Sequence, residues 1–125
     1  MTKTRTRLLL IAPMVLAAMS ARGAVLDSVC TIPSHQPNSF AARLDPARHM
    51  VIENGLPLAD GARSEELPSL AYFVSAAGSI IVWGARNART GATYYRYELD
   101  TTAGILSYDA ERFHAEGTCA PSTQL

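Results

Sequence analysis

The sequence predicts an all-β fold, a small antiparallel meander of about six strands that forms a barrel or a two-layer sandwich. Several stretches alternate apolar and polar residues, which is the period of a half-buried strand. Gly, Pro, Asn and Asp residues separate these stretches at short intervals, as turns between strands require. After the first twenty residues, the sequence nowhere sustains the spacing of a long amphipathic helix. One disulfide is expected to close the domain.

The expected strands follow one another with one long interruption. Apolar side chains occupy every second position in residues 39–45, and a turn that begins with Asp45-Pro46 leads into a return strand over 49–55. Residues 55–69 contain two prolines and an Asp-Gly pair, and we expect a long loop in which Asp60 could cap one or two helical turns. The remaining strands are expected at 69–75, 79–85, 92–100 and 105–113.

The N-terminus predicts export. Three basic residues and no acid precede a short apolar run, and small residues follow it, which is the pattern of a secretory signal peptide over residues 1–20. The apolar run is shorter than the about 20 residues that cross a bilayer. Cleavage is expected after Ser20 or Gly23. The rest, residues 21–125, is expected to be a single small β domain without a stable membrane anchor, in the periplasm or outside the cell.

Removal of residues 1–20 changes the charge of the molecule. Three of the eleven basic residues lie in that segment, so eight arginines remain against eleven acids, a net charge near −3. Nucleic acid is therefore not expected as a partner, because phosphate binding needs clustered positive charge. No cofactor is expected. The oligomeric state is left open.

The chain has two cysteines, Cys30 and Cys119, near opposite ends of the expected domain. In an oxidising compartment an even pair of this kind predicts a disulfide. The alternative is redox or metal chemistry, but the cysteines have no C-x-x-C spacing. The three histidines, His35, His49 and His114, are far apart and fit no metal-ligand spacing.

Three arginines, Arg86, Arg89 and Arg96, lie on the best-patterned hairpin and form the candidate binding residues. Arginine forks recognise carboxylate and phosphate groups, so the hairpin could bind an anion. The alternative is a solvated hairpin in which Arg96 pairs with a nearby acid such as Glu53 or Glu98.

A second hypothesis is catalytic. Glu98 and Arg96 are expected on one face of a strand, and His114 follows the final strand. In residue types this set resembles the small secreted microbial ribonucleases. The resemblance implies Glu98 as base, His114 as acid and Arg96 as the group that stabilises charge on the phosphoryl group. It covers about twenty residues, and the chain lacks the helix on which those enzymes pack their sheet.

The leading functional hypothesis is a non-enzymatic binding protein: an inhibitor, immunity protein or accessory factor that acts on another exported protein. Small β domains in this compartment often present loops on a rigid frame. The chain is similar in size, compartment and expected architecture to small periplasmic lysozyme inhibitors, although it contains none of their motifs. The candidate surface is the 86–91 loop together with the 54–69 loop.

Overall fold

The computed structural model describes residues 25–33 and 38–122. In these residues the chain forms nine strands and a short 3-10 helix, η2 (Pro46–Arg48). The strands are β1 (Leu26–Ile32), β2 (Asn38–Asp45), β3 (Met50–Glu53), β4 (Leu56–Ala59), β5 (Leu70–Ala77), β6 (Ile80–Asn87), β7 (Thr93–Asp100), β8 (Ile105–Ala110) and β9 (Phe113–Pro121). The predicted signal peptide, residues 1–20, and both expected cleavage points lie outside the described residues.

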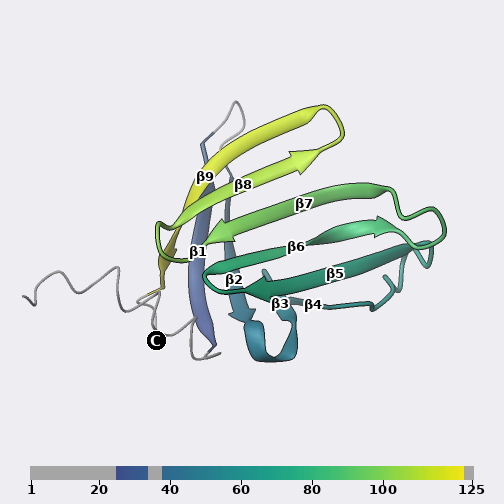
Figure 1. The fold of residues 1–125 in the computed structure, drawn as a ribbon, viewed down its shortest axis with the longest axis horizontal. Coiled ribbons are helices and arrows are strands. Elements are labelled where there is room, and N and C mark those ends of the chain that lie inside the picture. The colour runs from purple at the N-terminus through teal and green to yellow at the C-terminus, as the bar shows by residue number, and fades with distance from the viewer. Residues whose placement is uncertain (1–24, 34–37, 123–125) are drawn as a thin grey trace, which may run out of the picture.

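All nine strands belong to one antiparallel sheet with the order β4-β3-β2-β1-β9-β8-β7-β6-β5. Each strand pairs with the next strand along the chain except β4 and β5, which are the two edges of the sheet, and β1 and β9 pair with one another. In Figure 1, β5 to β8 run across the view while β1 and β2 stand upright, so the sheet is strongly coiled. It forms a nearly closed barrel. The predicted all-β antiparallel class is confirmed. Of the two predicted architectures, barrel and two-layer sandwich, the structure has the barrel.

The prediction of about six strands was wrong, because it missed β1, β4 and β9. On β1 the inward Leu26 and Ile32 are separated by the small Ser28 and Cys30, and β9 has Gly117 at an inward position, which weakens the alternation of apolar and polar residues. β4 contains Pro57, and proline is excluded from the middle of a sheet but tolerated at an edge. The last expected strand, 105–113, divides into β8 and the start of β9 at a turn where Glu111 has a φ of 50°.

The first seam of the barrel joins the two ends of the described chain. β1 and β9 pair in register, with Cys30 opposite Cys119, and the two cysteines form the predicted disulfide across 89 residues of sequence. At Gly117 the backbone of β9 comes so close to β1 that a Cβ atom would collide with the carbonyl oxygen of Thr31. A glycine is therefore required here by close approach of two backbones.

The second seam lies between β4 and β5. Because nine strands alternate in direction, β4 and β5 run the same way and cannot pair as antiparallel neighbours. The chain instead reverses after β4, and residues 61–64 run antiparallel to β5, with an isolated bridge between Arg63 and Ala71. The amide of Tyr72 donates to the carbonyl of Ala62 at 2.8 Å. Residues 61–64 thus occupy the position between β4 and β5 where a tenth antiparallel strand would otherwise be needed to close the barrel.

Asp60 has a different role from the one expected. The sequence suggested that it could cap one or two helical turns within 55–69, but the structure has no helix there. The Asp60 Oδ1 atom instead accepts a hydrogen bond from the amide of Val74 on β5 at 2.9 Å. The Asp60 side chain thus pairs with the Val74 amide, which lies beyond the part of β5 that residues 61–64 contact.

The interior of the barrel has two parts. One is aliphatic and fully buried, and its side chains, each at most 2% exposed, are Leu26, Leu44, Val51, Leu58, Val74, Ile81, Leu99 and Leu106. The other is aromatic and contains Phe40, Trp83 and Tyr97 in the buried cluster, with Tyr72, Tyr95 and Tyr108 partly buried against them. The predicted inward face of residues 92–100, with Tyr95, Tyr97 and Leu99, is confirmed.

Within residues 25–33 and 38–122, the chain forms no helix of the length and apolar character needed to cross a membrane. The disulfide is consistent with an oxidising, non-cytoplasmic compartment.

Candidate functional site

The loop between β6 and β7 is held in one conformation by Asn87. Its Oδ1 atom accepts hydrogen bonds from the amides of Arg89 and Thr90, at 2.9 and 3.0 Å. Its backbone carbonyl accepts from the amide of Gly91, whose φ of 79° suits glycine. Because local hydrogen bonds define the loop, the exposed Arg89 projects from a preorganised turn.

The same loop contacts the end of the 54–69 segment. The amide of Ala88 donates to the carbonyl of Ser69 at 2.7 Å, so the two loops named as the candidate surface meet at this point.

Arg86 is positioned by an aromatic ring and a glycine. Its guanidinium lies 4.9 Å from the ring centroid of Phe73 on the neighbouring strand β5, a cation–π contact. The Phe73 ring in turn lies over Gly84, where a Cβ atom would collide with that ring and with the carbonyl of Tyr95. Gly84 therefore makes room for the ring on which Arg86 stacks.

A bulge places Tyr94 beside this loop. The pairing of β6 and β7 shifts by one residue, with Ala85 opposite Tyr95 and Arg86 opposite Thr93, so Tyr94 is the extra residue. Its hydroxyl accepts a hydrogen bond from the Asn87 side chain at 2.9 Å, and its ring remains 39% exposed. The bulge thus adds an exposed aromatic side chain to the arginine loop.

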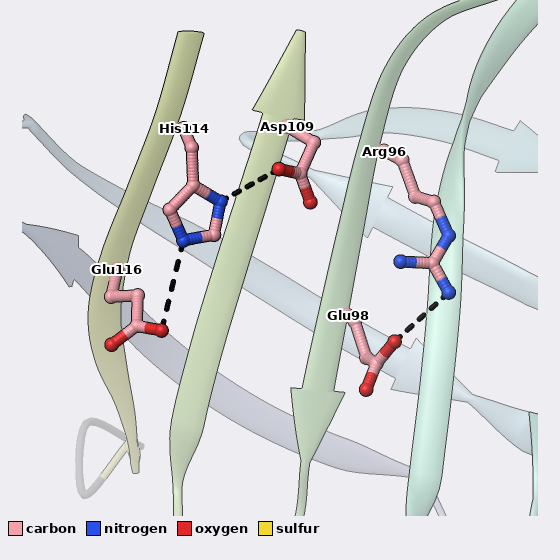
Figure 2. A network of polar contacts seen from close by, with 5 residues as sticks. All are labelled: Arg96, Glu98, Asp109, His114 and Glu116. Carbon is pink, nitrogen blue, oxygen red and sulfur yellow. Dashed lines mark hydrogen bonds and ion pairs between the residues drawn. The ribbon is translucent and has the colours of Figure 1, made fainter.

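Arg96 is separate from the other two arginines. Its Nη2 atom lies 2.9 Å from the Oε1 atom of Glu98, and both side chains lie on the outer face of β7 (Figure 2). Of the two partners named from the sequence, Glu98 is the one that pairs with Arg96. Within the described residues, neither Arg86 nor Arg89 makes an ion pair.

His114 lies on β9 and pairs with acids that the sequence analysis did not single out. Its Nδ1 atom is 2.6 Å from the Asp109 Oδ1 atom, and its Nε2 atom is 3.7 Å from the Glu116 Oε2 atom (Figure 2). The hydrogen bond to Asp109 raises the pKa of His114 above its ordinary value. Cross-strand pairing places Arg96, Asp109 and His114 in one row across three strands.

The structure therefore brings Glu98, Arg96 and His114 to one outer sheet face, where each is already engaged. Arg96 and Glu98 pair with one another, and His114 pairs with Asp109. These side chains are 41–57% exposed, so water screens their charges. The ribonuclease-type assignment of these residues stays a prediction.

Three contributors to this surface escaped the sequence analysis: Phe73, Asp109 and Glu116. Phe73 and Asp109 lie on different strands from the residues they contact, so strand register places them. Glu116 lies two positions after His114 on β9 and shares its face by alternation. Asp109 and His114 do carry a local signal, since they flank a two-residue turn and would face one another in any tight hairpin.

In the part of the chain that the structure describes, no group of three or more His, Cys, Asp or Glu side chains is placed to hold a metal ion. Comparison of the chain with protein-family models, with curated proteins and with solved structures finds no match. The site must therefore be interpreted from its own geometry.

Proposed function

We propose that the protein is an exported binding protein that contacts another exported protein through the 86–91 loop. The single observation that supports it most is the preorganised pair of arginines. Arg86 is stacked on Phe73, and Arg89 projects from a turn defined by Asn87. A surface that is ordered before binding loses less conformational entropy when the partner arrives.

Charge favours an acidic partner surface. Residues 86–91 contain two arginines and no acid, whereas residues 21–125 carry a net charge near −3. The loop is therefore a local positive site on a negative protein. Guanidinium groups without an acid of their own can form bidentate contacts with carboxylates of a partner. The exposed ring of Tyr94 beside them adds the aromatic contact that is common at binding hot spots.

The test is affinity capture with the oxidised protein from an extract of its own cell envelope, with mass spectrometry of the retained proteins. The Arg86→Ala, Arg89→Ala double variant should retain the partner at least about tenfold less well, since arginine hot spots contribute about 2 kcal/mol or more. Arg48→Ala is the matched control, because Arg48 is an exposed arginine on the distant η2 turn.

Two results would contradict the proposal. Either no protein is retained by the wild type above the level of a column without it, or the double variant retains the same protein as well as the wild type and the Arg48 control. Circular dichroism of the variants establishes that any loss reflects the loop and not unfolding.

A further inference from the structure

The aromatic part of the barrel interior contains a carboxylate. Glu53 lies at the end of β3, two positions after the fully buried Val51, and so points to the same inner face. Its Oε1 atom accepts a hydrogen bond at 3.2 Å from the indole Nε1–H of Trp83, which is fully buried on the far strand β6. From the sequence, Glu53 was expected only as a surface partner of Arg96.

Aromatic rings surround this carboxylate. Trp83 stacks on Tyr97 with ring centroids 5.0 Å apart, and Tyr97 contacts Tyr108 at 4.8 Å and Tyr95 at 5.9 Å. These rings come from β6, β7 and β8 and form a continuous aromatic wall. We call Glu53 with Trp83, Tyr95, Tyr97 and Tyr108 the aromatic chamber.

The chamber contains polar atoms that have no hydrogen-bond partner among residues 25–33 and 38–122. Tyr97 is only 7% exposed. Among the described residues, no hydrogen bond reaches the hydroxyl groups of Tyr95, Tyr97 or Tyr108, and the second oxygen of Glu53 accepts none. Glu53, Tyr95 and Tyr108 are partly exposed, whereas Tyr97 is buried. Buried polar groups in folded proteins are nearly always paired, so the Tyr97 hydroxyl beside this carboxylate needs a partner. A polar ligand that reaches these atoms would supply it.

The electrostatics agree with this geometry. Burial raises the pKa of Glu53 and of the Tyr95 and Tyr97 hydroxyls, and the negative charge of Glu53 raises the two tyrosine values further. No described cation pairs with Glu53. A positive ligand would relieve the cost of burying this carboxylate.

A cavity of about 610 Å³ lies next to the chamber at the β4–β5 seam. The residues of the aromatic chamber do not themselves line it. Of the residues that do, Tyr72 points inward from β5 near Tyr95, and the exposed Leu56 is the cross-strand partner of Glu53. Arg63, Glu65 and Glu66 also line the cavity, so its charged side chains sum to one net negative charge, which favours a positive ligand. The size is within the range of small-molecule sites.

We propose that the aromatic chamber and the adjoining cavity bind a small organic cation, an ammonium group with apolar substituents. The Glu53 carboxylate neutralises the ammonium group, the tyrosine rings pack against its substituents by cation–π contact, and the tyrosine hydroxyls bind polar atoms of the ligand. This site lies inside the barrel and is independent of the loop proposed to bind a protein.

The experiment uses choline as the probe and 3,3-dimethylbutan-1-ol, its uncharged isostere, as the comparison. Trp83 is the only tryptophan in the chain and donates to Glu53, so its fluorescence reports directly on the chamber. Choline should change this fluorescence in a saturable way and bind at least about tenfold more tightly than the alcohol. Absence of saturation, or equal binding of the two compounds, would overturn the proposal.

Variants locate the site. Glu53→Gln retains an acceptor for Trp83 but removes the charge, and should weaken choline binding at least about tenfold. Glu116→Gln removes an exposed carboxylate from the outer face and should leave binding unchanged. If both variants weaken binding equally, the effect is bulk electrostatics and the proposal fails. Should Glu53→Gln not fold, Tyr72→Leu tests the same site at its cavity side, and unchanged choline affinity in that variant would also contradict the proposal.

Discussion

The barrel closes at two seams that are built differently. The β1–β9 seam has a paired ladder, a close backbone approach at Gly117 and a covalent bond between Cys30 and Cys119. The β4–β5 seam has only residues 61–64 and the side chain of Asp60 between two strands that run in the same direction. The first seam joins strands that are distant in sequence, and the second joins strands connected directly by residues 60–69.

This difference follows from loop-closure entropy. The ends of a long segment lose more freedom when they meet than do the ends of a short segment, so the distant seam needs the stronger bond. The near seam can be closed by a few hydrogen bonds, and it is also the seam beside which the cavity lies. We infer that the β1–β9 seam is the more rigid of the two, and that solvent and ligands reach the cavity beside the β4–β5 seam.

The largest effect is expected from loss of the disulfide. Replacement of both cysteines, Cys30→Ala with Cys119→Ala, should lower the free energy of unfolding by about 4 kcal/mol, because the bond constrains a long loop in the unfolded chain. Urea denaturation measures this. The wild type under reducing conditions should approach the variant, and a loss under about 1 kcal/mol would mean that the β1–β9 ladder alone holds the seam.

A smaller effect is expected at the other seam. Asp60→Ala removes the acceptor of the Val74 amide and should cost about 1–2 kcal/mol, with faster hydrogen exchange at that amide. Glu66→Ala, an exposed acid in the same segment, is the control and should change neither quantity. Equal exchange rates in Asp60→Ala and the wild type would show that the side chain does not secure β5.

The smallest effect concerns the charges on the outer face of β9. The bond to Asp109 raises the pKa of His114 above 6.5, so the folded state holds the proton more tightly than the unfolded chain. The stabilisation is complete below pH 6.5 and is lost as the pH rises through the folded pKa. Melting temperatures should therefore fall slightly over that interval in the wild type. The fall should be absent in His114→Gln and smaller in Asp109→Asn, where Glu116 still interacts with His114; a persistent fall in His114→Gln would assign it to other groups.

The parts of the fold that could be predicted from the sequence are those in which a strand has a clear alternation of apolar and polar residues, or in which the residue type itself indicates the bond. Residues 92–100 alternate strongly and form β7 with the expected faces, and the cysteine pair forms the expected disulfide. β1 and β9 were not predicted in the same way, because several of their inward positions carry Ser28, Gly117 and cysteines, whose small size suits the crowded seam. β4 was not predicted because it contains Pro57, and a strand accepts proline only at the edge of a sheet.

The same limit applies to the candidate functional sites, where only residues close in sequence could be placed together. Arg86 and Arg89 could be placed on one hairpin because they are close in sequence. Arg96 was grouped with them but pairs with Glu98 farther along the strand. The inward position of Glu53 could not be predicted, since its alternation with Val51 places it inside only once this face of β3 is known to line a barrel. Contacts between distant strands depend on register, which local pattern does not contain.

The pairing of β1 with β9 also brings the first and last described residues of the chain close together, and the amide of Ser122 donates to the carbonyl of Asp27 at 2.8 Å. A short linker from Ser122 to Val25, with new termini opened at the exposed Gly78 turn, would give a circular permutant with every strand neighbour retained. In that molecule the two cysteines would be separated by only a short stretch of chain. The same sulfur bridge would then act as a local clasp and contribute far less to thermodynamic stability.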